Sequence, residues 1–464
     1  MDRRQAFDLA YLACAALIIF GLKQLASPRT AVRGNQVAAA AMAVVIAVTL
    51  WDSGSHNLIW IVAGMAIGGA IGVYSARAVK MTAMPQMVAL FNGVGGGAAA
   101  LIAFNEYHMA TSAGVALPND QVVSTLFSAI VGSVSFAGSM IAFGKLQELI
   151  TGSPVTMPGQ KVVNAALFAV VLGLAVWQFT GTQREGVLAI AMVLALLLGV
   201  IMVMAIGGAD MPVVISLLNS FTGMSAAATG FVLHNNALII AGTLVGASGT
   251  LLTMMMGRAM NRSIANVVFG AFGTGSGGAA VAAGASGGQV RATTADDVAV
   301  MLAYARRVVI VPGYGLAVAQ AQHNVRELAD LLEHRGVDVR YAIHPVAGRM
   351  PGHMNVLLAE ADVPYTQLYE MDDINDEFPR TDVTLVIGAN DVVNPAAKNT
   401  PGSPIYGMPV LNVDQSSAVV VLKRSMNTGF AGIENELFYD PKTTMLFGDA
   451  KDSIVNLISA VKAV

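Results

Sequence analysis

The sequence predicts a polytopic α-helical membrane domain followed by an α/β domain with a doubly wound parallel sheet. Two observations lead to this prediction. Hydrophobic residues make up 55% of the 464 residues and charged residues only 12%, a composition that is typical of a chain embedded in lipid. The charges are also distributed unevenly, because apolar runs dominate up to about Met256 and ordinary globular charge density begins at Arg291.

The membrane part is predicted from about nine apolar runs, each long enough for the roughly 20 residues that a helical span requires. These runs lie near residues 7–26, 36–52, 57–76, 86–105, 122–144, 162–180, 187–207, 212–233 and 237–257. A Gly/Ala/Ser tract between Ala271 and Gly288 lacks the side chains for a core and predicts a flexible linker. We therefore expect a transmembrane domain (1–262), a linker (263–290) and a soluble domain (291–464).

Lysine and arginine residues predict how these spans are oriented, since cytoplasmic loops carry the excess of positive charge. If the soluble domain is cytoplasmic, its side of the membrane carries Lys23, Arg29, Arg33, Arg77, Lys80, Lys145, Lys161, Arg258 and Arg262, whereas the opposite side carries Arg3, Arg4 and Arg184. This bias places the N-terminus outside and the C-terminal domain inside.

Polar residues within the spans are the first candidate functional residues. Asn92 and Asn219 lie inside apolar runs, and Asp210 lies at the edge of one. Because burying an unpaired polar group costs several kcal/mol, intramembrane polar residues are site candidates by default. Ser133, Ser135 and Ser139 lie in the fifth run, where the ordinary alternative for each serine is a bond back to a helix carbonyl.

Other features have ordinary interpretations. Glycine-rich stretches at 67–72, 93–97 and 242–249 are interpreted as helix-packing surfaces. The single cysteine, Cys14, lies in the first apolar run and cannot form an internal disulfide; that run is interpreted as an uncleaved span. The net charge of −3 gives no indication of nucleic-acid binding, and no metal site is predicted.

The soluble part begins with a pattern that is typical of a dinucleotide-binding crossover. An apolar strand runs into the turn Gly313-Tyr314-Gly315 and then into a helix that begins Leu316-Ala317-Val318. Strand candidates lie at 306–311, 337–343, 366–371, 383–388, 409–413 and 418–423, and helices are expected at 316–335, 353–361 and 450–462. This alternation predicts a Rossmann-like, doubly wound parallel sheet.

The same domain favours NADP(H) over NAD(H). The carboxylate that hydrogen-bonds the ribose 2′-hydroxyl of NAD usually lies near the end of the second strand, but strand 337–343 runs into His344 without one. Farther on, Lys423, Arg424 and Ser425 follow another strand and supply two cations and a hydroxyl that suit a phosphate monoester. The ordinary alternative is that the two cations form a solvated strand end.

Two further loops have the composition of phosphate and ribose binders. Gly348-Arg349-Met350-Pro351-Gly352-His353 opens a helix, where the backbone amides and Arg349 suit an anion. Gly388-Ala389-Asn390-Asp391-Val392-Val393-Asn394 follows a buried strand, at the position where open sheets bind ligands. Asp391 places an ionisable group there, so its protonation is expected to respond to the cofactor.

Together these motifs resemble the beta subunit of the proton-translocating NAD(P) transhydrogenase. The resembling segments are Gly313 to Gln320, His344 to Asn355, Gly388 to Lys398, Lys423 to Gly432 and Met445 to Lys451, with Gly207 to Val214 in the membrane part. The resemblance covers essentially the whole chain. It implies a proton-translocating NAD(P)+ transhydrogenase, in which hydride passes directly from NADH on a partner alpha subunit to NADP+ on this chain while a proton moves inward.

The resemblance also implies which residues act. The residues implied to bind NADP(H) are Gly313, Tyr314, Gly315, Leu316, Ala317, Val318, Ala319, His344, Val346, Ala347, Gly348, Arg349, Met350, Pro351, Gly352, His353, Gly388, Ala389, Asn390, Asp391, Val392, Asn394, Lys423, Arg424, Ser425, Met426, Asn427, Gly429, Phe430, Ala431, Gly448, Asp449 and Ala450. Lys423 and Arg424 are implied to bind the 2′-phosphate, and residues 423–432 to form part of a lid. Proton coupling is implied for Asp391, Asn219, Asp210, Asn92 and Ser139.

The resemblance further implies a complex of two alpha–beta pairs in the bacterial inner membrane, with a periplasmic N-terminus. Two residues depart from the pattern. Many relatives have histidine at the position of Asn92, and asparagine cannot take up a proton, so the partner subunit is one possible source of the titrating group. Phe430 replaces a common tyrosine, so any hydroxyl bond made there is lost.

Two other classes of protein are alternatives. A transport protein gated by a nucleotide, without redox chemistry, requires a filter sequence or paired interrupted spans around a charged midplane site. Gly93 to Gly97 superficially resembles a filter but occurs once and lacks a flanking re-entrant pattern. An oxidoreductase that passes electrons to a quinone or haem requires flavin or haem ligands, and the spans lack paired histidines.

Overall fold

The computed structural model of the chain describes residues 3–25, 28–52, 57–80, 83–151, 155, 157–180, 183–207, 210–259, 290–349, 352–401, 403, 405–429 and 432–464. The chain falls into two compact units, one formed by residues 1–206 and 214–253 and the other by residues 207–213 and 254–464. The predicted linker at 263–290 lies outside the described residues, except for Val290.

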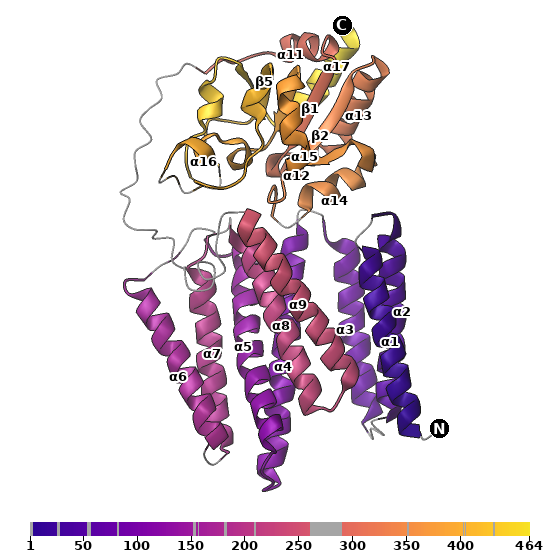
Figure 1. The fold of residues 1–464 in the computed structure, drawn as a ribbon, viewed down its shortest axis with the longest axis vertical. Coiled ribbons are helices and arrows are strands. Elements are labelled where there is room, and N and C mark those ends of the chain that lie inside the picture. The colour runs from indigo at the N-terminus through magenta and orange to yellow at the C-terminus, as the bar shows by residue number, and fades with distance from the viewer. Residues whose placement is uncertain are drawn as a thin grey trace. The chain divides into compact units, whose positions relative to one another are not determined.

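The N-terminal part of the described chain contains nine helices that are long and apolar enough to cross a bilayer (Figure 1). They are α1 (Arg3–Leu25), α2 (Pro28–Asp52), α3 (Leu58–Ala78), α4 (Met84–Ser112), α5 (Asn119–Leu146), α6 (Gln160–Thr180), α7 (Glu185–Met204), α8 (Met211–Val232) and α9 (Asn236–Ala259). The shortest has 20 residues and the longest 29, so each reaches across about 30 Å of hydrocarbon. The polytopic membrane part is thereby confirmed.

Glycines allow several of these helices to pack closely. A Cβ built at Gly132 of α5 would lie 2.6 Å from the carbonyl oxygen of Gly96 on α4. One at Gly249 of α9 would lie 2.9 Å from the backbone nitrogen of Ser220 on α8. These stretches therefore have the predicted packing role. In α3, by contrast, no described atom lies within 4 Å of a Cβ built at Gly68, and no described residue of this helix is buried.

Lys145, near the end of α5, joins this helix to the end of α7. Its side chain is almost fully buried, and its ammonium group donates to the carbonyls of Met204 at 2.6 Å and Ile206 at 2.8 Å. The last carbonyls of a helix lack intrahelical partners and carry the negative end of its dipole, so a cation is stabilised there.

The second unit contains a six-stranded parallel sheet in the order β3-β2-β1-β4-β5-β6. The strands are β1 (Arg307–Pro312), β2 (Asp338–Ile343), β3 (Leu368–Glu370), β4 (Val383–Ile387), β5 (Ala418–Lys423) and β6 (Thr443–Phe447). This is the strand order of the Rossmann fold, so the predicted fold class is confirmed.

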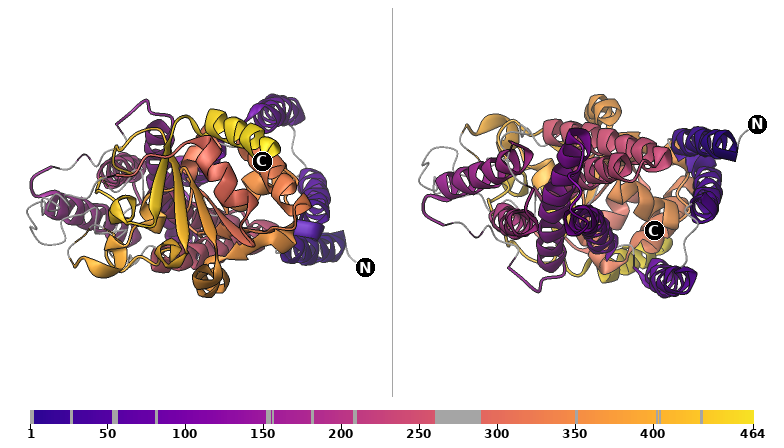
Figure 2. Two further views of the ribbon diagram at one scale, coloured as in Figure 1. Left: turned by 90° about the horizontal axis from the view of Figure 1, so that it is seen from above. Right: turned by 90° about the horizontal axis from the view of Figure 1, so that it is seen from below.

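Helices cover both faces of this sheet, and the strands fan out between them (Figure 2). The longer helices are α11 (Ala295–Ala303), α12 (Tyr314–Ala319), α13 (Gln322–His334), α14 (His353–Glu360) and α17 (Ala450–Ala463). The short ones are η3 (Tyr365–Gln367), α15 (Met371–Ile374), η4 (Asn375–Arg380), η5 (Asp391–Val393), α16 (Ala396–Asn399), η6 (Val413–Gln415) and η7 (Glu436–Tyr439).

The two faces of the sheet build two separate cores. Val308 and Ile310 of β1 pack with the longer helices, whereas Val309 and Val311 pack with residues of α15, η4, η6 and η7. All four valine and isoleucine side chains are fully buried. This burial on both sides explains why β1 reads as a continuous apolar run instead of an alternating one.

Three details differ from the prediction. Residues 409–413 are not a strand: Val410, Leu411 and Val413 are buried, but 409–412 form a loop in which the backbone N–H of Leu411 donates to the carbonyl of Val392, and Val413 begins η6. Strand β6 at Thr443–Phe447 was not predicted. The helix expected at 316–335 is broken into α12 and α13, because Gln320 adopts a left-handed conformation with φ of 51°.

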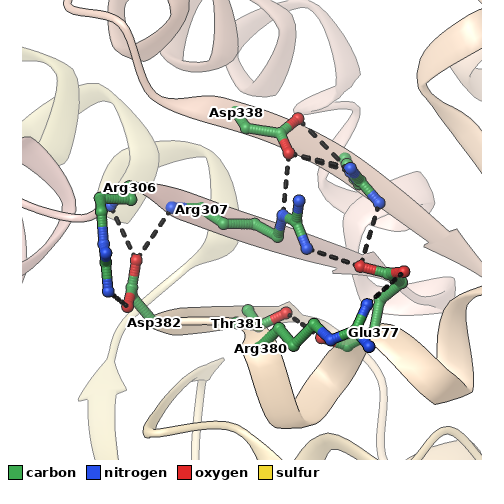
Figure 3. Close-up of polar contacts among 8 residues, drawn as sticks. Arg306, Arg307, Asp338, Glu377, Arg380, Thr381 and Asp382 are labelled. Atoms are coloured by element: carbon green, nitrogen blue, oxygen red, sulfur yellow. Dashed lines mark hydrogen bonds and ion pairs between the residues drawn. The ribbon is translucent and has the colours of Figure 1, made fainter.

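Charged residues tie the strands together at the amino edge of the sheet (Figure 3). Arg307 donates to Asp338 at 2.8 Å and to Glu377 at 2.5 Å, and its backbone N–H donates to Asp382 at 3.0 Å. Partial burial alone would raise the pKa of Asp338, but hydrogen bonds from Arg340 and Arg307 hold it below the usual value. This network lies at the edge opposite the predicted nucleotide-binding loops.

Candidate functional site

The predicted nucleotide-binding segments meet at the carboxyl edge of the sheet. All strands are parallel, so their carboxyl ends lie at one edge. The glycine turn follows β1, His344 follows β2, the Gly388 loop follows β4, Lys423 ends β5 and Gly448 follows β6. The structure thus brings segments that are far apart in sequence to the crevice where open α/β sheets bind ligands.

The glycine turn packs directly on the Gly388 loop. The backbone N–H of Gly315 donates to the carbonyl of Gly388 at 2.9 Å, and Gly313 donates to Ile387 at 2.9 Å. A Cβ at Gly315 would lie 2.7 Å from the Cα of Gly388, which itself has a positive φ of 65°. Close approach of two backbones, as well as turn geometry, therefore requires glycine at these positions.

Arg349 places a positive charge beside the glycine turn. Its guanidinium group lies over the ring of Tyr314, 4.5 Å from the centroid. Its backbone N–H donates to Nδ1 of His353 at 3.0 Å, and burial followed by the charge of Arg349 lowers the pKa of that histidine. His353 is therefore neutral at pH 7 and carries its proton on Nε2. A stacked, oriented guanidinium suits an anionic ligand.

His344 fixes the end of β2. Its Nδ1 accepts the backbone N–H of Val346 at 3.2 Å, so in the neutral ring Nε2 donates to the carbonyl of Pro409 at 2.8 Å. Burial lowers the pKa of His344 to about 4, although the bond to Pro409 partly opposes this. The imidazole is therefore a neutral link between the end of β2 and the loop at 409–412.

The Asn390–Asp391 loop contacts Gly429 of the predicted lid segment (423–432) and Asn435, which lies beyond that segment. Asn435 donates to the backbone carbonyl of Asn390 at 3.0 Å and to its side-chain oxygen at 3.1 Å. Gly429 lies directly against this loop, since a Cβ there would be 2.5 Å from Oδ1 of Asp391. The segment after β5 thus packs on the predicted coupling residue.

Lys423 is half-buried at the end of β5. Its ammonium group donates to the carbonyl of Asn427 at 2.6 Å and lies 4.6 Å from the centroid of the Phe438 ring. Burial lowers the pKa of Lys423, and the negative charge of Asp391 partly opposes this. The neighbouring Arg424 is exposed. The two cations therefore differ: one is oriented by the protein and the other is free to adapt to a ligand.

A polar cluster joins three of the membrane helices. Asn92 of α4 donates to Ser139 of α5 at 2.9 Å and reaches Ser135 at 3.5 Å. Ser135 bonds to Thr222 of α8 at 2.6 Å and donates to the carbonyl of Leu218 at 2.9 Å. These bonds run between helices, so the ordinary alternative of a bond back to the same helix does not describe Ser135.

The other two predicted membrane residues, Asn219 and Asp210, lie on α8 and directly before it. Asn219 is half-buried on α8, three residues before Thr222, and its side chain makes no hydrogen bond with a described residue. Within the described residues, the side-chain oxygen of Asn92 is also buried without a hydrogen-bond donor. The cluster therefore contains a buried acceptor that no described residue supplies with a hydrogen-bond donor.

The comparison with known proteins identifies the family. The family model described as NAD(P) transhydrogenase beta subunit matches residues 7–460. The chain belongs to this family. NAD(P) transhydrogenase subunit beta of Rhodospirillum rubrum is 50% identical over 458 residues, which cover 97% of this chain and 98% of that relative. The protein of the same name from Rhodospirillum rubrum strain ATCC 11170 matches equally well. This family is one of proton-translocating oxidoreductases, and the chain combines membrane helices with a Rossmann-like domain.

In this member of the transhydrogenase family, the side chains of several predicted nucleotide-binding residues stabilise the fold. Leu316 and Ala317 are fully buried in the core. Asn394 donates to the carbonyl of Glu434 and accepts from the N–H of Ala396. Asp449 caps α17. For the buried residues Leu316, Ala317 and Asn394 only the backbone is available to a ligand, whereas Asp449 is exposed. Met350, Pro351, Phe430 and Ala431 were also predicted, and they lie outside the described residues.

Three residues of this transhydrogenase chain have structural roles that the sequence did not indicate. They are Thr222 in the membrane cluster, and Asn435 and Phe438 at the carboxyl edge. The sequence could have indicated Thr222, because it lies one helical turn from the candidate Asn219 on the same helix. Asn435 and Phe438 belong to no motif, and only the folded chain places them beside Asn390 and Lys423.

Proposed function

We propose that this chain binds NADP(H) at the carboxyl edge of its sheet and exchanges hydride directly with NAD(H) held by a partner alpha subunit. This exchange is coupled to inward movement of a proton across the bacterial inner membrane. The observation that carries the proposal is the family match over residues 7–460. The name of the R. rubrum relatives, subunit beta, supports a partner alpha subunit, and we extend this to a complex of two alpha–beta pairs.

The geometry of the carboxyl edge supports a nucleotide with a 2′-phosphate. Lys423 is an oriented cation at the end of β5, Arg424 is beside it, and Arg349 lies over Tyr314 next to the glycine turn. Strand β2 ends at Ile343 without the carboxylate that would favour NAD. We assign the 2′-phosphate to Lys423 and Arg424, and the remaining phosphates to the glycine turn and the Arg349 loop.

The chain needs no acid or base for the redox step. The nicotinamide supplies the hydride chemistry when bound, and the residues of this chain bind it, orient it and exclude water. Hydride exchange between two nicotinamides of nearly equal potential cannot by itself hold NADPH far from equilibrium with NADH. One charge crossing about 150 mV supplies roughly 3.5 kcal/mol, which changes an equilibrium ratio by a factor of several hundred. A single proton per hydride is therefore sufficient.

Proton coupling is assigned to groups in both units. Asp391 is the carboxylate of the loop after β4 in the proposed nucleotide site, and Gly429 of the adjoining segment packs on it. Asn92, Ser139, Asn219 and Asp210 are assigned to the membrane route, in which Asn92 acts through its hydrogen bonds because asparagine does not titrate. The domain limits that go with this proposal are 1–262 for the membrane domain, 263–290 for the linker and 291–464 for the NADP(H) domain.

Proton pumping by inverted membrane vesicles that contain both subunits tests the proposal. Acidification of the vesicle interior or exterior is followed by a pH-sensitive dye while the hydride exchange is followed separately by absorbance. We expect Asp391→Asn and Asn219→Leu to abolish or uncouple pumping while both subunits still assemble. Asp362→Asn, at an exposed carboxylate beyond α14, is the matched control and should pump normally.

Two outcomes would contradict parts of this proposal. If Asp391→Asn and Asn219→Leu both pump at the wild-type rate, the assigned proton route is wrong. If vesicles move protons or other ions in response to NADPH without any hydride exchange, the chain is a nucleotide-gated transporter, and the proposed redox function is wrong.

A further inference from the structure

Two contacts within the chain hold the Lys423 ammonium group in place. It donates to the backbone carbonyl of Asn427 at 2.6 Å, and it lies 4.6 Å from the centroid of the Phe438 ring. A cation within about 6 Å of a ring centroid is attracted by the negative face of the ring. The flexible four-carbon stem of Lys423, which would otherwise sample many rotamers, is restricted by these two contacts.

Phe438 is itself rigidly placed. Its ring is 2% exposed and belongs to the core on the second face of the sheet. It lies in η7, which is capped by Asn435: the side-chain oxygen of that residue accepts the N–H of Leu437 at 3.0 Å, and its amide donates to Asn390. One asparagine therefore fixes both the loop after β4 and the helix that carries the ring.

We propose that Phe438 is a positioning residue that sets the selectivity of this chain for nucleotides with a 2′-phosphate, by holding the Lys423 ammonium group ready for that phosphate. This inference rests on the proposed NADP(H) site. The ring has no group that can bind a phosphate, so it acts only through the lysine. Restricting Lys423 in advance removes part of the ordering cost that binding would otherwise incur. A nucleotide without the 2′-phosphate gains nothing from this restriction.

The test measures how tightly the full-length chain, purified in detergent, binds NADPH and its 2′-dephospho counterpart NADH. Phe438→Leu removes the ring but keeps an apolar side chain, and Phe438→Tyr keeps the ring. We expect Phe438→Leu to weaken NADPH binding by about threefold to tenfold, the range for loss of a partly desolvated cation–ring contact. NADH binding should change by less than about twofold, and Phe438→Tyr should keep the wild-type preference for NADPH.

A double-mutant cycle separates positioning from general stability. In the Lys423→Ala background, Phe438→Leu should cause no further change in the ratio of NADPH to NADH affinity. An equal loss of both nucleotides, or an additive loss of the ratio in the Lys423→Ala background, would overturn the proposal. Phe438→Met serves as a second ringless variant if thermal unfolding shows that the leucine variant is not folded.

Failure of the underlying site assignment gives a different result. If Lys423→Ala alone leaves the ratio of the two affinities unchanged, the 2′-phosphate does not bind at Lys423, and the proposed NADP(H) geometry is wrong at that position. If Lys423→Ala lowers the ratio but Phe438→Leu does not, the site assignment stands and only the role of Phe438 is rejected.

Discussion

The side-chain amide of Asn92 donates to the hydroxyl of Ser139 at 2.9 Å, joining α4 to α5. This bond orients a buried polar group that we assign to the proposed proton route. It holds the amide nitrogen toward α5 and leaves the amide oxygen without a described donor. Asn92 is thus a fixed hydrogen-bonding element that cannot carry the proton itself.

Removing the Asn92 side chain should lower the stability of the protein without abolishing proton transport. Asn92→Ala breaks the bonds to Ser139 and Ser135, which are worth about 0.6 kcal/mol each in membrane helices. We expect a lower unfolding temperature in detergent but residual proton pumping in vesicles. The exposed Asn105 of α4 provides the control variant Asn105→Ala. Complete loss of pumping at normal stability would mean that the proton passes by way of Asn92, for instance on an ordered water.

Lys423→Ala should weaken NADP(H) binding by about 1.5–3 kcal/mol, the range for a hydrogen bond to a charged group. The affinity for the 2′-dephospho nucleotide should stay nearly unchanged, because its ribose offers no phosphate to the ammonium group. Titration calorimetry with both nucleotides measures this difference. Lys451→Ala, which removes an exposed cation from α17, is the control. Equal losses for both nucleotides would make Lys423 a structural residue.

The fragment from about residue 290 to the end should be soluble and should bind NADP(H) much more tightly than NAD(H). It carries all six described strands and both cores of the sheet, so it buries its own apolar surface. Expression of this fragment followed by calorimetry tests the prediction. Insolubility would show that the domain depends on the membrane part, and equal affinities would contradict the assignment of Lys423 and Arg424.

The stability of this fragment should fall as the pH drops from about 6.5 toward 4, in part because of His344. Burial lowers the pKa of His344 to about 4 in the folded chain, whereas the unfolded chain takes up the proton near the ordinary value of 6.5. The unfolded state therefore binds more protons in this range, and the contribution of His344 is complete above it. About 2.5 pKa units correspond to about 3 kcal/mol.

Urea unfolding at several pH values measures this effect. His344→Gln should flatten the pH dependence between 4 and 6.5, whereas His334→Gln, at an exposed position at the end of α13, should leave it unchanged. A wild-type slope in the His344→Gln variant would show that other groups account for the acid sensitivity.

The fold was largely predictable because its main signals are local. The membrane helices follow from the length of their apolar runs, and β1, β2, β4 and β5 from runs that are buried on both faces. Strand β6 begins with Thr443 and Thr444, so its run is too short to stand out. The segment 409–413 was misassigned because apolar residues can be buried under a sheet without pairing with it.

The candidate site was predictable only where a motif marks it. The glycine turn, the Gly388 loop and Lys423 each have a recognisable composition after a strand. Phe438 has none, since it lies 15 residues beyond Lys423 in the chain and meets it only because β5, η7 and β6 are packed together. The membrane cluster was predicted in part: Asn92 and Ser139 were expected, but their meeting across two helices depends on tertiary packing.

The contact between Gly315 and Gly388 limits how the cofactor preference of this domain can be redesigned. A Cβ at either position would lie within 2.7 Å of the other Cα, so random libraries that vary these two loops will consist mostly of chains that do not fold. Diversity is better confined to the stretch after β5, where Arg424 and Ser425 are exposed. Design of an NAD-specific variant should therefore change residues such as Arg424 and Ser425 and leave Gly315 and Gly388 unchanged.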